Sequence, residues 1–330
     1  MGRLTEGAPL GRATLTIDVA EELGAATPVL LRGWAMGPAT APAGSPVVFC
    51  LAGGGCSTGY FDLQVEGLDG YSMAEAFARR GLFVVAVDHP GIGASDPVAD
   101  LSALTPSVVA ACQAHVVREV VTALSAGALR PLPAVATPFV VGLGHSMGGL
   151  LATVTQAHHR SFSALIGAGH AGTGLPEVLT DEELAVAGPD LASVEERIGA
   201  LARFRFAPDS VVPRRQPAHG TFFADDVPEA VRRAFADQAV PLLTTCGLAA
   251  MIPDSARTER AAIDVPVFLA FGDDDLVTDP MASLAQYRSA TDAALYVLAG
   301  SGHCHNQAGG RHRLWSRLAD WITSVASAPT

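Results

Sequence analysis

Residues 138–152 read PFVVGLGHSMGGLLA, and this stretch decides how the chain is expected to fold. Its first half is a short apolar run rich in valine, which is typical of a buried strand. The run ends in the pattern Gly-x-Ser-x-Gly at residues 144–148, and helix-compatible residues follow over 150–159. The sequence therefore predicts a strand, a sharp turn that carries Ser146, and a helix.

The residue types in this turn have chemical reasons. A serine that acts as a nucleophile must expose its hydroxyl, and a sharp strand-to-helix turn does this while it points the next backbone N–H at the developing oxyanion. Such a turn strains the backbone and crowds its neighbours, which favours glycine two positions to either side. The helix also directs its positive N-terminal end toward the reacting centre. With a strand before it and a helix after it, the stretch resembles the nucleophile turn of the α/β-hydrolase fold superfamily.

A second glycine-rich loop carries the resemblance further. The apolar run at residues 46–52 predicts a strand covered on both faces, and it leads into three consecutive glycines at 53–55. In the resembled fold this loop supplies one backbone N–H of the oxyanion hole, and the residue after the nucleophile supplies the other. By position these donors are Gly54, with Gly55 as the alternative, and Met147. The family often has histidine before these glycines, where this chain has alanine.

The resemblance also implies a catalytic triad. A serine hydroxyl is a poor nucleophile at neutral pH, so it needs a neutral imidazole to take its proton. The imidazole in turn needs a carboxylate that fixes its tautomer and stabilises its charged form. In this superfamily the order along the chain is serine, then Asp or Glu, then histidine, each at the end of a strand.

The chain offers these residue types in that order. Ser146 is followed by Asp275, which lies three residues after a glycine that ends the apolar run 265–271, as in the resembled pattern. His303 ends a Gly-Ser-Gly-His sequence after the last predicted strand. Asp274 is the alternative acid and His305 the alternative base.

Residues 171–260 differ in character from the rest of the chain. Acidic residues and prolines recur, and short amphipathic stretches replace the alternation of strands and helices. In the resembled fold this is the place of a helical cap, which shapes the substrate pocket and excludes water. Five phenylalanines could line that pocket or form the core of the cap: Phe204, Phe206, Phe222, Phe223 and Phe235.

The predicted fold class is therefore α/β, an α/β-hydrolase fold with a mostly parallel central sheet flanked by helices and an inserted helical cap. The expected core domain comprises residues 1–170 and 261–330, and the expected cap or lid comprises residues 171–260. The resemblance itself covers about residues 45–170 and 262–327.

Composition narrows the partners and the chemistry. The formal net charge of −12 argues against nucleic acid and anionic membranes as partners. All 21 basic residues are arginine, which excludes a lysine Schiff base or a P-loop. The five cysteines are scattered, and the histidines lack metal-ligand spacing, so neither a disulfide framework nor a metal or other cofactor is expected.

The termini and hydropathy indicate the compartment. The first residues lack the pattern of a signal peptide, and no run of 18 apolar residues offers a membrane span. The expectation is a soluble cytoplasmic protein that acts on a small molecule; the sequence does not specify an oligomeric state.

The predicted function is that of a serine hydrolase. It would cleave a carboxylic ester, lactone or thioester of a small, fairly apolar substrate through an acyl-enzyme on Ser146. Hydrolysis of a C–C bond in a diketone is the alternative on the same scaffold, because the loop at residues 53–55 and the Ser146–Met147 pair also resemble those enzymes. A small-molecule receptor without turnover is a further alternative. Haloalkane dehalogenases and epoxide hydrolases are disfavoured, because they place aspartate where Ser146 stands.

Overall fold

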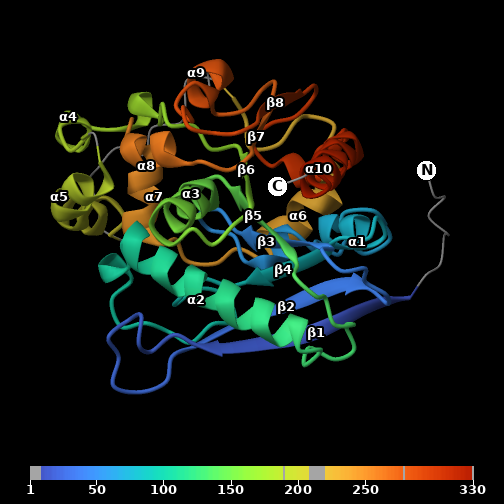
Figure 1. Cartoon of the computed structure of the whole chain (residues 1–330). Coiled ribbons are helices and arrows are strands. Elements are labelled where there is room, and N and C mark those ends of the chain that lie inside the picture. Colours follow the sequence, from blue (N-terminus) through green and yellow to red (C-terminus); the bar gives the residue numbers. More distant parts are fainter. Residues whose placement is uncertain (1–8, 189, 208–219, 278, 329–330) are drawn as a thin grey trace.

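The computed structural model describes residues 9–188, 190–207, 220–277 and 279–328. A single eight-stranded sheet in the order β1-β2-β4-β3-β5-β6-β7-β8 forms the centre of the fold (Figure 1). The strands are β1 (Leu10–Asp18), β2 (Leu30–Pro38), β3 (Pro46–Leu51), β4 (Phe83–Val87), β5 (Phe139–His145), β6 (Ala164–Ala168), β7 (Val267–Gly272) and β8 (Ala293–Leu298). β1 pairs antiparallel with β2, and β2 pairs antiparallel with β4. The other six strands, β3 to β8, are parallel to one another.

Ten α-helices belong to the described part of the chain. They are α1 (Met73–Ala78), α2 (Pro106–Ser125), α3 (Met147–His159), α4 (Asp181–Leu184), α5 (Leu191–Arg205), α6 (Glu229–Ala236), α7 (Thr244–Met251), α8 (Arg257–Ala262), α9 (Pro280–Leu284) and α10 (Arg311–Ala326). α2 and α3 pack together on one side of the sheet, and α1 and α10 pack together on the other (Figure 1). This is the predicted α/β-hydrolase fold, a mostly parallel sheet between two layers of helices.

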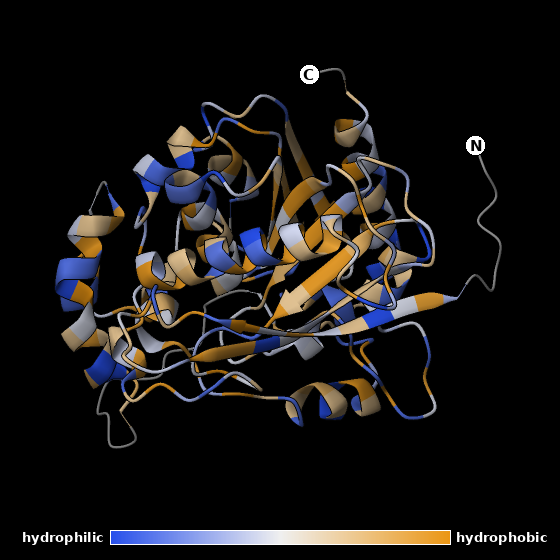
Figure 2. Cartoon of the chain, turned by 60° about the horizontal axis from the view of Figure 1, so that its bottom comes forward, coloured by the Kyte–Doolittle hydropathy of each residue, from blue (hydrophilic) through white to orange (hydrophobic). Residues whose placement is uncertain are grey.

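The central strands are apolar throughout because both of their faces are covered. In β3, Val47 and Phe49 belong to the core under α2, whereas Val48 and Cys50 belong to the core under α1 and α10. Successive side chains of a strand point to opposite faces, so a strand covered twice needs apolar residues at every position. The orange strands in the interior of Figure 2 show this pattern.

Helix α2 tests the predicted absence of a membrane span. It is the one helix in the described residues that is long and apolar enough to cross a membrane by length and composition. The core helix of a soluble protein passes the same test, and half of this segment is buried inside the fold. Val109, Cys112 and Val116 of α2 pack into the core beside the sheet, which accounts for its apolar composition.

The chain between β6 and β7 forms helices joined by loops, and no strand, where it is described. It contains α4 to α8, and its last helix ends at Ala262, two residues beyond the predicted range 171–260. α5 and α7 share a buried cluster with Leu150 and Val154 of α3, so most of this insertion lies at the α3 side of the molecule (Figure 1). Its role as a cap stays a prediction.

Candidate active site

Ser146 lies at the turn between β5 and α3, where the sequence predicts it. Its backbone has φ 53° and ψ −122°, a conformation that residues other than glycine rarely adopt. Its N–H donates to the Ala168 carbonyl at the end of β6, at 2.8 Å. The turn is therefore anchored to the neighbouring strand and holds Ser146 in a strained conformation.

Close backbone contacts explain the glycines on either side. A Cβ at Gly144 would lie 2.0 Å from the Gly148 carbonyl oxygen, and a Cβ at Gly148 would lie 2.0 Å from the Leu51 carbonyl oxygen. Real Cβ atoms do not come this close to other atoms, so both positions require glycine. The turn thus packs directly against the end of β3.

Ser146 opens into a cavity of about 290 Å³. His303, Gly54 and Met147 line the same cavity, so four of the predicted site residues meet there. Most other lining side chains are apolar. The described residues that line the cavity are Gly54, Ser146, Met147, Gly169, His170, Ala171, Gly174, Leu175, Phe206, Phe222, Leu242, Gly247, Ala250, Met251, Leu276, Val277 and His303. The cavity suits an uncharged, apolar group.

Asp275 and His303 form a buried hydrogen-bonded pair just behind this cavity. His303 Nδ1 lies 2.7 Å from Asp275 Oδ1, and Asp275 is 5 % exposed. An ionised carboxylate only accepts, so Nδ1 carries the proton and the neutral ring leaves Nε2 as an acceptor. Ser146 and His303 share the cavity, but no hydrogen bond joins them within the described ranges. Such bonds are often long in enzymes without substrate.

A second histidine bonds to the same carboxylate. His305 Nε2 lies 2.7 Å from Asp275 Oδ2. The backbone N–H groups of Leu276 and Gly272 also donate to Asp275, at 2.7 and 3.2 Å. Burial opposes ionisation of Asp275, but the charges and hydrogen bonds of His303 and His305 outweigh it and hold the pKa of this carboxyl well below its usual range.

The alternative acids have other partners. Asp274 is exposed, and its carboxylate accepts from the Thr221 hydroxyl at 2.9 Å. Asp279 accepts from the N–H of Ala282 and caps α9. Among the acids of this loop that the structure describes, Asp275 is the one bonded to a histidine. The alternative base, His305, is 1 % exposed and is not part of the cavity lining.

Gly54 and Met147, the predicted oxyanion donors, both line the cavity. Met147 is the first residue of α3, where a backbone N–H has no partner within the helix. Within the described residues, neither N–H donates to a backbone carbonyl outside its own element.

His89 lies next to the loop that carries Gly54. Its Nε2 lies 3.1 Å from the Ala52 carbonyl oxygen, and the side chain of Gln113 is hydrogen-bonded to its other ring nitrogen. His89 thus supports the loop from inside the core.

Residues 220–222 of the insertion are bonded to the loops that carry Asp275 and His303. The His303 N–H donates to the Thr221 carbonyl at 2.7 Å, and the Cys304 N–H donates to the Phe222 carbonyl at 2.7 Å. The Thr221 N–H donates to the Asp274 carbonyl at 2.8 Å. The sequence carries no pattern from which this contact could have been predicted.

Two of the five predicted pocket phenylalanines line the cavity, Phe206 and Phe222. The Phe222 ring meets the His303 ring edge-on at 5.7 Å. Phe204 is 55 % exposed, whereas Phe223 and Phe235 pack against each other with ring centres 5.3 Å apart.

Two more histidines surround the pair without sharing its carboxylate. His145 Nε2 lies 2.9 Å from the His303 carbonyl oxygen and supports that loop. His170 lines the cavity, and burial together with the charge on Arg260 lowers its pKa to about 3. Both are therefore neutral at physiological pH.

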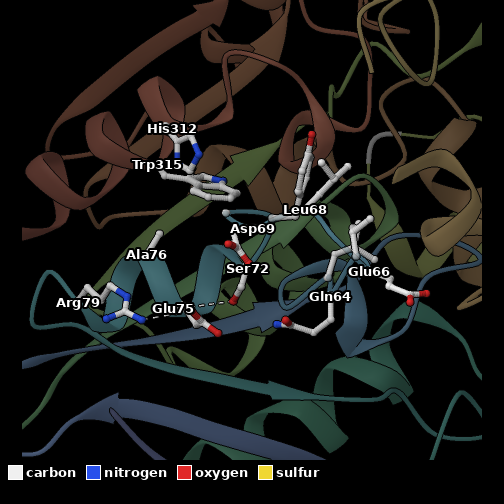
Figure 3. A pocket seen from close by; sticks show the side chains of 14 residues that line it. Gln64, Glu66, Leu68, Asp69, Ser72, Glu75, Ala76, Arg79, His312 and Trp315 are labelled. Carbon is white, nitrogen blue, oxygen red and sulfur yellow. Dashed lines mark hydrogen bonds and ion pairs between the residues drawn. The ribbon is translucent and has the colours of Figure 1, made fainter. Parts of the chain in front are cut away.

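No group of side chains in the described ranges is arranged to hold a metal ion, and the cysteines there are unpaired. Burial raises the pKa of Cys304 well above its ordinary value, so this thiol beside His303 is unreactive. A larger hollow of about 750 Å³ lies against α1 and α10, lined in part by Glu66, Asp69 and Trp315 (Figure 3). It contains none of the predicted site residues.

Comparison with known proteins agrees with the fold. The chain matches the family model described as "Alpha/beta hydrolase family" over residues 47–311. A search of curated protein sequences gave no significant match.

Solved structures with a similar fold come from several organisms. Bromoperoxidase from Bacillus anthracis has a TM-score of 0.61 at 16% identity, over 94% of this chain and 100% of that chain. Monoacylglycerol lipase from Paleococcus ferrophilus has a TM-score of 0.58 at 17% identity, over 86% and 96%. A thermophilic esterase from Thermogutta terrifontis has a TM-score of 0.58 at 18% identity, over 95% and 99%. At such identities the likeness establishes the fold.

Proposed function

Because the chain belongs to the alpha/beta hydrolase family, we propose that it is a serine hydrolase with Ser146, His303 and Asp275 as its catalytic triad. One observation carries the proposal: Ser146 on a strained turn shares an apolar cavity with His303, whose Nδ1 lies 2.7 Å from Asp275. A structural role alone would not require a strained serine beside a buried His–Asp pair.

The chemistry follows from the tautomer of His303. Its unprotonated Nε2 takes the proton of Ser146 as Oγ attacks the acyl carbonyl, and the backbone N–H groups of Gly54 and Met147 bind the oxyanion. When the intermediate collapses, the imidazolium gives this proton to the leaving oxygen or sulfur. A water molecule then loses a proton to His303 and attacks the acyl carbon, and His303 returns this proton to Ser146 Oγ as the acid is released. Asp275 stabilises the imidazolium in both halves of the reaction.

The lining of the cavity supports an uncharged, fairly apolar acyl group. Among the residues that the structure describes, none that lines the cavity carries a carboxylate or guanidinium, and His170 is neutral because its pKa is about 3. Burying an unpaired charge costs several kcal/mol, so a charged acyl chain would bind poorly. A carboxylic ester, lactone or thioester of modest size is the proposed substrate class. The helices of the insertion, which supply Phe206, Ala250 and Met251 to the lining, would act as the cap.

The test compares the wild type with Ser146→Ala on p-nitrophenyl esters of two to twelve carbons. Removing the nucleophile should lower kcat by about 10³-fold or more, and the chain-length optimum should reflect the cavity. Circular dichroism and thermal melting establish that both proteins fold. Ester hydrolysis that survives in Ser146→Ala would refute the serine mechanism. A folded wild type that turns over no ester, thioester or lactone would refute the proposed substrate class.

A further inference from the structure

The Asp275 carboxylate has two histidine partners, one on each oxygen. His303 bonds to Oδ1 and His305 bonds to Oδ2, both at 2.7 Å and both buried. We propose that His305 is a positioning residue, which holds the Asp275 carboxylate toward His303 and shares its negative charge. This inference rests on the function proposed above.

The hydrogen-bonding capacity of His305 points to this single role. The ionised carboxylate can only accept, so His305 donates from Nε2 and its neutral ring leaves Nδ1 unprotonated. In the described residues, Nδ1 of His305 is buried and has no hydrogen-bond partner. A buried polar atom without a partner costs about 1–3 kcal/mol, so its place beside Asp275 calls for an explanation. Among the described residues, Asp275 is the one hydrogen-bond partner of this side chain.

The packing around the two rings is built to admit both of them. Gly169 has φ +64°, and a Cβ there would lie 3.0 Å from atoms of both His303 and His305. Glycine at this position therefore leaves the space in which the two imidazoles flank one carboxylate. The ring of His145, the last residue of β5, packs edge-on against the ring of His305, with an angle of 86° between the ring planes and 5.7 Å between their centres.

The other titratable groups that face this cluster do not change charge near neutral pH. Burial, with the charges of His303 and His305, keeps the pKa of His145 well below its ordinary value. Burial and the charge of Arg260 lower the pKa of His170 to about 3. Burial raises the pKa of Tyr60 and Cys304 well above their ordinary values. Asp274 lies in the same loop but is exposed to solvent. His145, His170, Tyr60 and Cys304 therefore each keep one protonation state near neutral pH.

Sharing the carboxylate has a predictable effect on the base. A carboxylate that also accepts from His305 attracts the imidazolium of His303 less strongly than one that accepts from His303 alone. Without the second donor, Asp275 would hold the proton on His303 up to a higher pH. The acid limb of the pH profile of kcat/KM would then move to higher pH, while the freed carboxylate would lose part of its orientation.

The experiment compares three variants on the best p-nitrophenyl ester, with His303→Gln as the reference for loss of the proposed base. His305→Leu removes the donor, and we expect roughly a tenfold loss of kcat/KM at the optimum with the acid limb about one pH unit higher. His305→Gln offers an amide donor in place of Nε2 and should lose less. His115→Gln is the matched control, because His115 also pairs with a carboxylate at 2.7 Å, that of Glu22, but lies on α2 away from the cavity. It should behave as the wild type does.

Several outcomes would overturn the inference. A loss of rate in His305→Leu with no movement of the acid limb would show that His305 only fills space. A loss in His305→Gln as large as that in His303→Gln would make His305 the base. Equal behaviour of His305→Leu and His115→Gln would show that the bond to Asp275 has no effect.

A second readout needs no activity and separates this inference from the proposed function. In the Ser146→Ala background, NMR titration of the histidine ring protons should show His303 protonating at higher pH once His305 is leucine, and at a pH between those of wild type and leucine once it is glutamine. A wild type without hydrolase activity would refute the proposed function while this titration still decides the role of His305. An unchanged titration would refute the inference even if the enzyme is active. Should His305→Leu fail to fold, His305→Gln supplies both readouts.

Discussion

Replacing Gly148 by alanine would place a methyl group against the backbone of β3. The added Cβ would lie 2.0 Å from the carbonyl oxygen of Leu51, 2.6 Å from its carbonyl carbon and 2.7 Å from the carbonyl oxygen of Ala52. An ordinary carbon–oxygen contact is about 3.3 Å, so the backbone must move by roughly 1 Å. Leu51 is the last residue of β3, which is paired on both sides, so this movement meets resistance. Gly148 lies in α3, where alanine is itself favoured over glycine, so any net loss of stability must come from the clash.

Both stability and activity should respond. Overpacking costs about 1–3 kcal/mol, and we expect about 3 kcal/mol here because rigid backbone atoms are involved. For a chain of this size that corresponds to a fall in Tm of about 5 °C. The loop that begins at Ala52 would shift relative to Ser146, and a misplacement of about 1 Å can cost on the order of 10²-fold in rate.

The assay is thermal melting with ester hydrolysis, and Gly199→Ala is the matched control. Gly199 lies in α5 with nothing within 4 Å of an added Cβ, so alanine there should stabilise by about 0.5–1 kcal/mol. The two substitutions are chemically identical and should have opposite signs. A Gly148→Ala protein that melts and turns over substrate as the wild type does would refute this account of the turn.

Two further predictions concern charge. His170 takes up a proton below about pH 6.5 in the unfolded chain, but only near pH 3 in the folded protein. The free energy of unfolding should therefore fall by about 2 kcal/mol between pH 6.5 and 5. In His170→Gln this fall should be smaller. Urea titrations at several pH values measure this, and equal slopes for both proteins would contradict it. Arg205→Met should lower the free energy of unfolding by about 3 kcal/mol, because it leaves the buried Glu183 without the guanidinium that lies 2.6 Å away. Arg203 is exposed and pairs with Asp100 at the surface, so Arg203→Met should change this free energy by less than about 1 kcal/mol. Similar losses in the two methionine variants would refute the role of burial.

Local patterns explain why much of the fold could be predicted from the sequence. The strand, turn and helix around Ser146 follow from residues that are neighbours in the chain. The apolar runs of the parallel sheet follow from burial on both faces. The chain order of Ser146, Asp275 and His303 follows from the resemblance, and the structure places Asp275 and His303 within a hydrogen bond. Their catalytic roles stay predictions.

Contacts between distant loops explain what could not be predicted. The position of His305 in the sequence, seven residues after the last strand, does not indicate that its ring reaches Oδ2 of Asp275. Thr221 lies in a stretch without periodicity, so its contact with His303 depends on how the insertion folds back. The choice between His303 and His305 likewise needs the cavity, which His303 lines.

The bond between residues 220–222 and the His303 loop bears on how such a protein can be re-engineered or can diverge. The insertion begins after β6 and ends before the neighbouring strand β7, so it could be replaced by another insertion without a change in the order of the strands. In this chain the insertion also contains the carbonyl groups of Thr221 and Phe222, which accept hydrogen bonds from the N–H groups of His303 and Cys304. A chimera with a foreign insertion would acquire a new pocket and lose these acceptors together. We therefore expect an exchange of the insertion to change both the substrate range and the rate of the proposed reaction.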